Sequence, residues 1–198
     1  MRAGPLVVVG DSLLDRDVSG RAERLSPDAP VPVVSAVTES ERPGGAALAA
    51  LLAALDRPAG GVVLVTALGA DPAGERVAEL LAAAGVGVVA TRLPGRTPEK
   101  ERVRVAGQSL LRLDREDGTV RPVPGTPAMR EAVAAAGAVL VSDYGRGLLA
   151  GADVRGWLAG AARRGPVVWD PHPRGAPPVP GVRLATPSLA EALGFAGT

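Results

Sequence analysis

Aspartates follow several short apolar runs in this 198-residue chain, and their positions suggest chemistry at one edge of a sheet. The runs are Leu6–Val9, Val62–Thr66, Ala138–Ser142 and Pro166–Trp169, and the aspartates after them are Asp11 with Asp15, Asp71, Asp143 and Asp170. If the runs are parallel strands, their carboxyl ends meet along the edge where α/β folds bind ligands. Carboxylates there suit sugar hydroxyls or Mg²⁺. Each Asp could equally cap the turn or helix that follows it, and both interpretations stay open.

A glycine pair, Gly44-Gly45, precedes an Ala/Leu run that predicts a helix to about Leu55. A glycine-rich turn into a helix N-terminus directs free N–H groups outward and can cradle an anion. The pair belongs to neither GxxxxGK[ST] nor GxGxxG. Close backbone approach to a neutral polyol is as plausible, and so is a tight turn that simply needs glycine.

Gly10-Asp11-Ser12-Leu13 matches the short signature of the GDSL esterases, with Ser12 as nucleophile. That family also uses an Asn and a late Asp-x-x-His. This chain has no Asn, and Asp170-Pro171-His172 is one residue too close. Without a base held by a third group, Ser12 is not an activated nucleophile. The sequence therefore disfavours an esterase.

Composition excludes several other classes of protein. The chain has 22 Lys+Arg against 21 Asp+Glu, which gives no support to a nucleic-acid or polybasic membrane partner. It has no Cys and one His, so thiolate and multi-His metal sites are excluded, and no metal site is assigned. No apolar run reaches the ~18 residues of a membrane span, and the first residues are too short for a secretory signal. We expect a cytoplasmic protein.

Apolar runs alternate with helical patterns along the chain. Strands expected at 62–66, 86–90, 138–142, 166–169 and 182–185 alternate with helices at about 45–55, 72–84, 127–136 and 153–164. This alternation predicts an α/β fold with a mostly parallel sheet. Segment 16–42 is polar and Pro-rich, and Pro30 and Pro32 keep its β-like patch at an edge or off the main sheet. A hairpin is expected around Gly107-Gln108. No linker divides the chain, so we expect a single domain over 1–198.

Taken in order, these segments resemble the ribokinase/phosphofructokinase-B sugar kinase superfamily, and most closely its D-glycero-β-D-manno-heptose 7-phosphate kinase branch. The match runs over nearly the whole chain. The stretches that carry the resemblance are Val8–Arg16, Arg24–Val33, Glu41–Ala47, Gln108–Asp114, Ser142–Leu149, Trp169–Pro171 and Thr186–Glu191. The Ser-Pro-Asp-Ala-Pro-Val-Pro-Val stretch at 26–33 is distinctive of that branch.

The resemblance implies a ribokinase-like fold, a β lid over about 16–42, and ATP-dependent phosphoryl transfer to a sugar phosphate such as heptose 7-phosphate. It places ATP and Mg²⁺ beside Ser188 and Glu191, and it suggests a homodimer through the lid. The residues that it places around the substrate are Asp11 and Asp15 on the sugar hydroxyls, Gly44 and Gly45 at the sugar, and Lys100 and Arg102 near the phosphate.

The chain also departs from the family pattern. Leu48 and Ser188 stand where the family has Asn, and Arg146 and His172 stand where this branch usually has Lys. The family's Gly-Ala-Gly-Asp-type motif, which supplies the anion hole and the catalytic base, falls beyond residue 198, so no catalytic residue is assigned. We expect a C-terminally truncated kinase that is inactive on its own and that a separate C-terminal polypeptide could complete. The alternative is a non-catalytic sugar- or protein-binding pseudokinase module.

Overall fold

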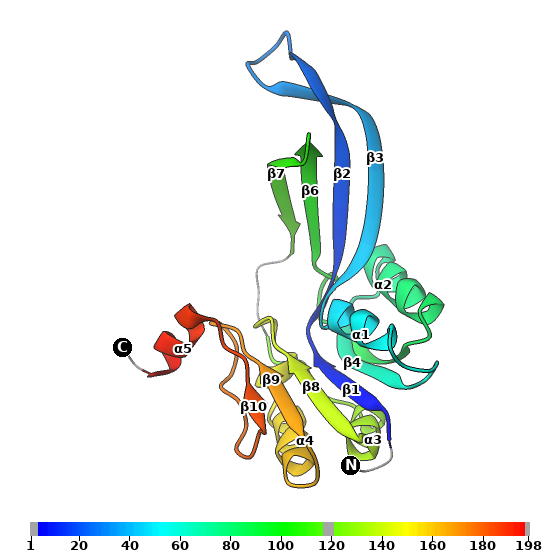
Figure 1. The fold of residues 1–198 in the computed structure, drawn as a ribbon, viewed down its shortest axis with the longest axis vertical. Helices are drawn as coiled ribbons and strands as arrows, with labels where there is room; N and C mark the ends of the chain where they lie inside the picture. The colour runs from blue at the N-terminus through cyan, green and yellow to red at the C-terminus, as the bar shows by residue number, and fades with distance from the viewer. Residues whose placement is uncertain (1–3, 117–120, 197–198) are drawn as a thin grey trace.

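A six-stranded parallel sheet forms the body of the protein in the computed structural model, which describes residues 4–116 and 121–196 (Figure 1). The strands of this sheet A lie in the order β10-β9-β8-β1-β4-β5. Their bounds are β1 Leu6–Gly10, β4 Val62–Leu68, β5 Gly87–Arg92, β8 Ala138–Ser142, β9 Val167–Asp170 and β10 Leu184–Ala185. The predicted α/β fold with a mostly parallel sheet is confirmed.

Two helices pack on each face of sheet A. Helices α3 (Pro127–Ala135) and α4 (Ala152–Ala162) pack with one core cluster, around Met129 and Leu158. Helices α1 (Ala46–Ala54) and α2 (Pro72–Ala83) pack with the second cluster, on the opposite face. A short 3-10 helix, η1 (Leu148–Ala150), follows β8, and α5 (Leu189–Ala196) extends away from the body near the C-terminus (Figure 1).

A second sheet, sheet B, projects from the body, and we call it the lid (Figure 1). Its strands, in the order β3-β2-β6-β7, are β3 (Pro32–Gly45), β2 (Ser12–Leu25), β6 (Glu99–Val105) and β7 (Gln108–Arg115). Strand β3 is an edge strand of this sheet, so the expectation that the Pro-rich segment stays off the main sheet is confirmed. The expected hairpin is also present, with its turn at Ala106-Gly107 between β6 and β7. The lid is larger than segment 16–42, because β6 pairs with β2 over seven residues.

None of the helices within the described residues is long and apolar enough to cross a membrane.

Asp71 is one of the aspartates that follow a strand, and its carboxylate caps α2. Its Oδ1 accepts the Gly74 N–H at 2.9 Å, and its Oδ2 accepts the Thr97 N–H at 2.7 Å. We expect Asp71→Ala to lower the free energy of unfolding by about 2–4 kcal/mol, since it removes a helix cap and a second acceptor. Asp71→Asn keeps one acceptor oxygen and should lose less. Urea unfolding of both variants checks this, and equal stability of Asp71→Ala and wild type would contradict it.

Candidate functional site

Asp11 holds the loop that follows β8. Its Oδ2 accepts the N–H groups of Tyr144 (3.2 Å) and Arg146 (3.0 Å), and its Oδ1 accepts the Leu148 N–H (3.3 Å). The side chain is buried, and burial raises the pKa of the Asp11 carboxyl while the N–H donors offset part of that effect. The carboxylate therefore positions loop 143–148. Its expected contact with sugar hydroxyls stays a prediction.

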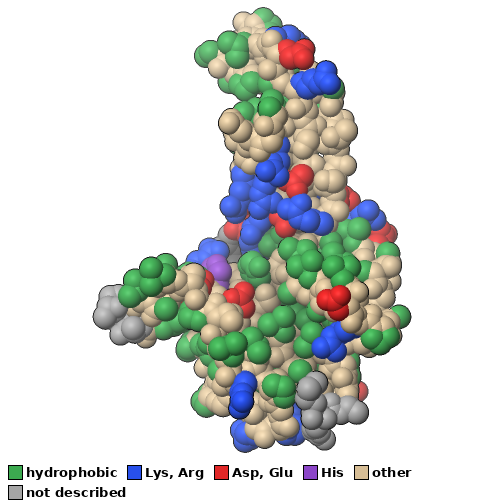
Figure 2. All heavy atoms as spheres, viewed as in Figure 1, with side chains coloured by type: hydrophobic (Ala, Val, Ile, Leu, Met, Phe, Trp, Pro, Cys, Tyr) green, Lys and Arg blue, Asp and Glu red, His purple; other side chains and the backbone are tan. Residues whose placement is uncertain are grey.

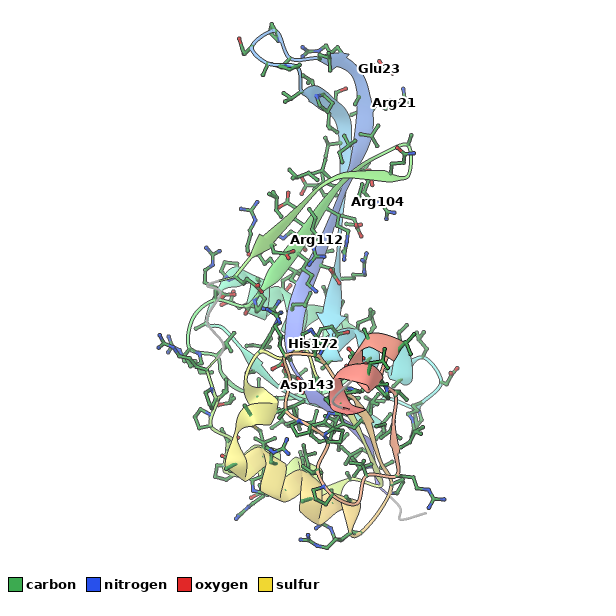
Figure 3. All side chains as sticks on the ribbon, turned by 90° about the vertical axis from the view of Figure 1, so that its left-hand side faces the viewer. Arg21, Glu23, Arg104, Arg112, Asp143 and His172 are labelled. Atoms are coloured by element: carbon green, nitrogen blue, oxygen red, sulfur yellow. The ribbon has the colours of Figure 1, made fainter. Side chains whose placement is uncertain are left out.

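Asp143 begins that loop and is itself buried. Its Oδ1 accepts the Gly145 N–H at 2.7 Å. Burial raises the pKa of Asp143 to about 6, and the charge of Asp11 adds to the increase, while Arg155 on α4 opposes it. Asp11 and Asp143 together hold the loop at the foot of the lid, where Figure 3 shows Asp143 beside His172.

The pKa of Asp143 predicts a pH dependence of stability. The folded pKa of about 6 lies above the ~3.9 of an unfolded Asp, so the unfolded chain loses this proton first as the pH rises. The contribution of Asp143 to the free energy of unfolding therefore falls between about pH 4 and pH 6, by about 3 kcal/mol, and is constant above that range. We expect Asp143→Asn to lack this decline. Urea unfolding of both proteins across that range measures the free energy of unfolding. If the free energy of wild type minus that of Asp143→Asn stays constant or grows as the pH rises, the raised pKa of Asp143 is contradicted.

Tyr144, in loop 143–148, contacts residues of both the body and the lid. Its ring stacks on His172 with centroids 6.3 Å apart, and the Lys100 Nζ lies 5.8 Å from the Tyr144 centroid. His172 Nδ1 accepts the Arg174 N–H at 3.1 Å, so the proton of the neutral imidazole is on Nε2. Burial lowers the pKa of His172, and the nearby Arg174 adds to this effect. The only Tyr and the only His of the chain thus form one stack between the lid and the body.

Asp15 lies on β2, at the base of the lid. In the strand register it is the neighbour of Arg42 on β3 and of Lys100 on β6. Its Oδ1 accepts a hydrogen bond from Arg102 Nη1 at 3.0 Å. A Cβ placed on Gly44 would lie 2.6 Å from Asp15 Oδ2, so only glycine lets the backbone pack this closely against the carboxylate. Arg42 Nε lies 4.0 Å from the same oxygen.

Gly45 is the second glycine of the pair. It has φ +65°, and a Cβ there would lie 2.4 Å from the Asp11 carbonyl oxygen and 3.5 Å from the Tyr144 ring. Glycine is therefore required by both the backbone conformation and the space. The pair brings the start of α1 against both Asp15 and Tyr144.

Most of the cationic side chains on the face of the lid that carries Asp15 make ion pairs with carboxylates. Those pairs are Arg42–Asp17, Arg102–Asp15, Arg112–Asp114 and, from loop 143–148, Arg146–Glu116. Among the described residues, neither Lys100 nor Arg104 on β6 makes an ion pair with a carboxylate, and Arg104 donates instead to the Gly107 carbonyl oxygen. Burial lowers the pKa of Lys100, and the charges of Arg112 and Arg146 lower it further. Figure 2 shows the resulting concentration of basic side chains where the lid meets the body.

On its other face, the base of the lid is linked to α2 by ion pairs. Glu41 on β3 pairs with Arg16 on β2 at 3.2 Å and with Arg76 on α2 at 2.8 Å. Arg16 also pairs with Glu99 on β6 at 3.0 Å. These pairs connect three lid strands to a helix of the body, so they fix the base of the lid against sheet A.

Ser188 and Glu191 lie at the start of α5 and cap it. The Ser188 N–H donates to Glu191 Oε2 at 2.7 Å, and the Glu191 N–H donates to Ser188 Oγ at 3.4 Å, which is a reciprocal capping box. The Ser188 N–H also lowers the pKa of Glu191. Within the described residues no group of three or more His, Cys, Asp or Glu side chains could hold a metal ion.

Ser12 is buried in β2, and its Oγ lies 2.8 Å from the Thr66 hydroxyl. This contact explains the serine as part of the packing between β2 and β4, in agreement with the rejection of an esterase.

The structure brings together Asp15, Gly44, Gly45, Lys100 and Arg102, with Asp11 beneath them. Ser188 and Glu191 lie apart from this group, at the start of α5. Sequence reasoning missed the Tyr144–His172 stack and the charged partners Arg42, Arg112 and Asp114. The alternation of charge along β6 and β7 was a signal for the partners, since alternate residues of a strand share one face.

Comparison with known proteins identifies the chain's relatives. It is 55% identical over 192 residues to the bifunctional protein HldE of Streptomyces coelicolor. The match covers 97% of this chain and 39% of that protein. The HldE of Halorhodospira halophila is 43% identical and matches 94% of this chain and 39% of its own length. The chain thus spans about 39% of the length of these relatives. No protein-family model matches the chain.

Solved structures share the fold. Arabidopsis thaliana ribokinase, complexed with ribose and ATP, aligns with a TM-score of 0.67 and 24% identity over 99% of this chain and 64% of that one. A carbohydrate kinase from Agrobacterium tumefaciens aligns with a TM-score of 0.60 and 23% identity over 85% of this chain and 53% of its own. These relatives and this fold support the resemblance to the ribokinase/phosphofructokinase-B superfamily and to its heptose phosphate kinase branch.

Proposed function

We propose that the base of the lid binds a sugar phosphate, as the substrate site of a carbohydrate kinase of this superfamily. One observation carries the proposal. The carboxylate of Asp15 lies beside the part-buried ammonium group of Lys100, which makes no ion pair within the described residues, at the foot of a lid. A polyol needs acceptors for its hydroxyl groups, and a phosphate needs a cation.

Each residue of the proposed site has a distinct role in binding the sugar phosphate. Asp15 accepts hydrogen bonds from the sugar hydroxyls, while Arg102 donates to the same carboxylate and orients it. Gly44 and Gly45 let the sugar approach the backbone. Lys100 binds the phosphate, and the Tyr144 ring forms a flat wall beside it. Asp11 acts through the loop that it holds, so we propose it as a positioning residue.

ATP is the phosphoryl donor that the superfamily implies, and a ribokinase of the same fold is complexed with ATP. When bound, it would supply the γ-phosphoryl group. Ser188 and Glu191 are the residues that the resemblance places beside it. In this structure both residues are engaged with each other in the α5 capping box.

Binding without turnover is the second candidate function for this chain. Leu48 replaces an Asn of the family motif, and no Gly-x-Gly-Asp sequence occurs in the 198 residues. Phosphoryl transfer depends on positioned charges and a base. We therefore expect this chain, assayed alone, to bind a sugar phosphate without releasing ADP. A coupled ADP assay tests this expectation, and turnover at an ordinary kinase rate of about 1 s⁻¹ or more would contradict it. Completion by a second polypeptide and a homodimer through the lid remain predictions.

Asp15→Asn is the variant that tests the sugar site. We expect it to weaken the binding of heptose 7-phosphate by about 1–3 kcal/mol, because a charged acceptor is lost. Asp28→Asn, at the exposed end of the lid, is the matched control and should bind like wild type. Isothermal titration calorimetry measures all three proteins, and equal affinity in Asp15→Asn and wild type would remove Asp15 from the site.

A further inference from the structure

A second loop, residues 172–176 after β9, rests directly on the buried carboxylate of Asp143. The Gly175 N–H closes this loop by donating to the His172 carbonyl oxygen at 2.8 Å. A Cβ on Gly175 would lie 2.2 Å from Asp143 Oδ2, so only glycine lets the backbone come this close to the carboxylate. The Ala176 N–H also favours the charged form of Asp143. Yet among the described residues no donor completes a hydrogen bond with Oδ2.

Helix α4 adds the opposite charge to this environment through Arg155. The charge of Arg155 favours ionised Asp143, whereas the charge of Asp11 opposes it. Within the described residues Arg155 Nη1 is buried without a hydrogen-bond partner, and the guanidinium lies 6.0 Å from the Trp169 ring centroid on β9. A buried charge is costly unless an opposite charge compensates it. Asp143 and Arg155 therefore compensate each other, which couples α4 to the carboxylate.

The two loops that meet at Asp143 carry the two rings of the aromatic stack. Tyr144 follows Asp143 directly, and His172 begins the second loop. Their ring centroids are 6.3 Å apart. The loops also touch at Gly145, where a Cβ would lie 2.8 Å from His172 Nδ1. Because Asp143 Oδ1 accepts the Gly145 N–H at 2.7 Å while Oδ2 supports Gly175, one carboxylate contacts both loops.

We propose that Asp143 is a positioning residue of the sugar phosphate site, which fixes both loops so that the Tyr144–His172 stack lies against Lys100. The inference rests on the function proposed for the base of the lid. Asp143 itself is 3% exposed, so it acts through the stack and not on the ligand. Lys100 Nζ lies 5.8 Å from the Tyr144 ring centroid, so a displaced ring takes away a neighbour of the cation that binds the phosphate.

Asp143→Asn in the full chain tests the proposal. Asn has one oxygen for two positions, so it can accept the Gly145 N–H only by turning its NH₂ group toward Gly175 and the charge of Arg155. We expect the NMR signals of the His172 imidazole to move, because the ring current of Tyr144 acts on them. His172 is the only His and Tyr144 the only Tyr, so these signals are unambiguous. Heptose 7-phosphate should bind about tenfold more weakly by calorimetry.

Asp153→Asn is the matched control on α4. Asp153 Oδ2 accepts the Gly125 N–H at 2.8 Å, so this aspartate bonds a different loop, and its variant should keep wild-type His172 signals and affinity. Arg155→Met removes the charge that faces Asp143 and keeps an apolar stem on Trp169. It should move the His172 signals and weaken binding as well. It decides the question alone if Asp143→Asn does not melt cooperatively by circular dichroism.

Two results would overturn the positioning role while the proposed function stands. One is a folded variant, Asp143→Asn or Arg155→Met, with wild-type His172 signals. The other is a variant whose His172 signals move while heptose 7-phosphate binds as it does to wild type, because the stack would then not belong to the site. Failure of the proposed function is a separate result, since wild type itself would then bind no heptose 7-phosphate, and the positioning role would fall with it.

Discussion

Asp11→Ala is expected to lower the free energy of unfolding by about 3–5 kcal/mol, a large part of the 5–15 kcal/mol available to a typical domain. The reason is that the N–H groups of Tyr144, Arg146 and Leu148 all donate to this one carboxylate. Each buried donor left without an acceptor costs about 1–3 kcal/mol. Urea unfolding measures the change, and the Tyr144 environment, followed by its fluorescence or NMR signals, should change with it.

Asp28→Ala is the control for this prediction, since Asp28 lies in the exposed part of the lid and should be neutral. Asp11→Asn retains one acceptor oxygen and should fall between the two. If Asp11→Ala is as stable as wild type, the carboxylate does not hold loop 143–148, and its role would then be the direct contact with substrate that the resemblance implies.

Gly10→Ala is expected to prevent folding, or to cost more than about 4 kcal/mol. A Cβ on Gly10 would lie 1.9 Å from the Ser142 carbonyl oxygen on β8, and backbone cannot move aside without separating β1 from β8. This close approach is also what brings Asp11 within reach of the loop after β8.

The same chemical change elsewhere provides the control. A Cβ on Gly156, inside α4, would meet no atom within 4 Å, so Gly156→Ala should stabilise the protein by about 0.5–1 kcal/mol through helix propensity. Thermal unfolding of both variants compares them. A soluble Gly10→Ala protein with a wild-type melting temperature would show that β1 and β8 do not pack as described.

The fold followed from the sequence where local patterns decide it. Continuous apolar runs such as Ala138–Ser142 and helices such as Pro127–Ala135 were predicted to within a few residues. The pairing of β2 with β6 was not predicted, because it joins segments more than eighty residues apart and leaves no local pattern. Pro30 and Pro32 did indicate that the lid stays off sheet A, since proline cannot donate to a central strand.

The candidate site was only partly predictable. An Asp after a strand has the same sequence pattern whether it binds a ligand or caps a turn, and Asp71 and Asp143 proved to bond to backbone N–H groups. Ser188 and Glu191 likewise have the spacing of a capping box as well as of the family motif. Lys100 makes no ion pair although Asp15 and Asp114 are its cross-strand neighbours, because both aspartates pair with arginines, and only the three-dimensional arrangement decides this.

The most direct test of the sugar phosphate site compares heptose 7-phosphate with the same heptose lacking its phosphate, titrated by calorimetry into wild type and Lys100→Gln. Lys100 is the chain's only lysine, and it makes no ion pair within the described residues. We expect wild type to prefer the phosphorylated sugar by about tenfold or more, and Lys100→Gln to lose most of that preference while keeping its affinity for the unphosphorylated sugar. Equal preference in the two proteins, or no binding of either sugar to folded wild type, would contradict the account.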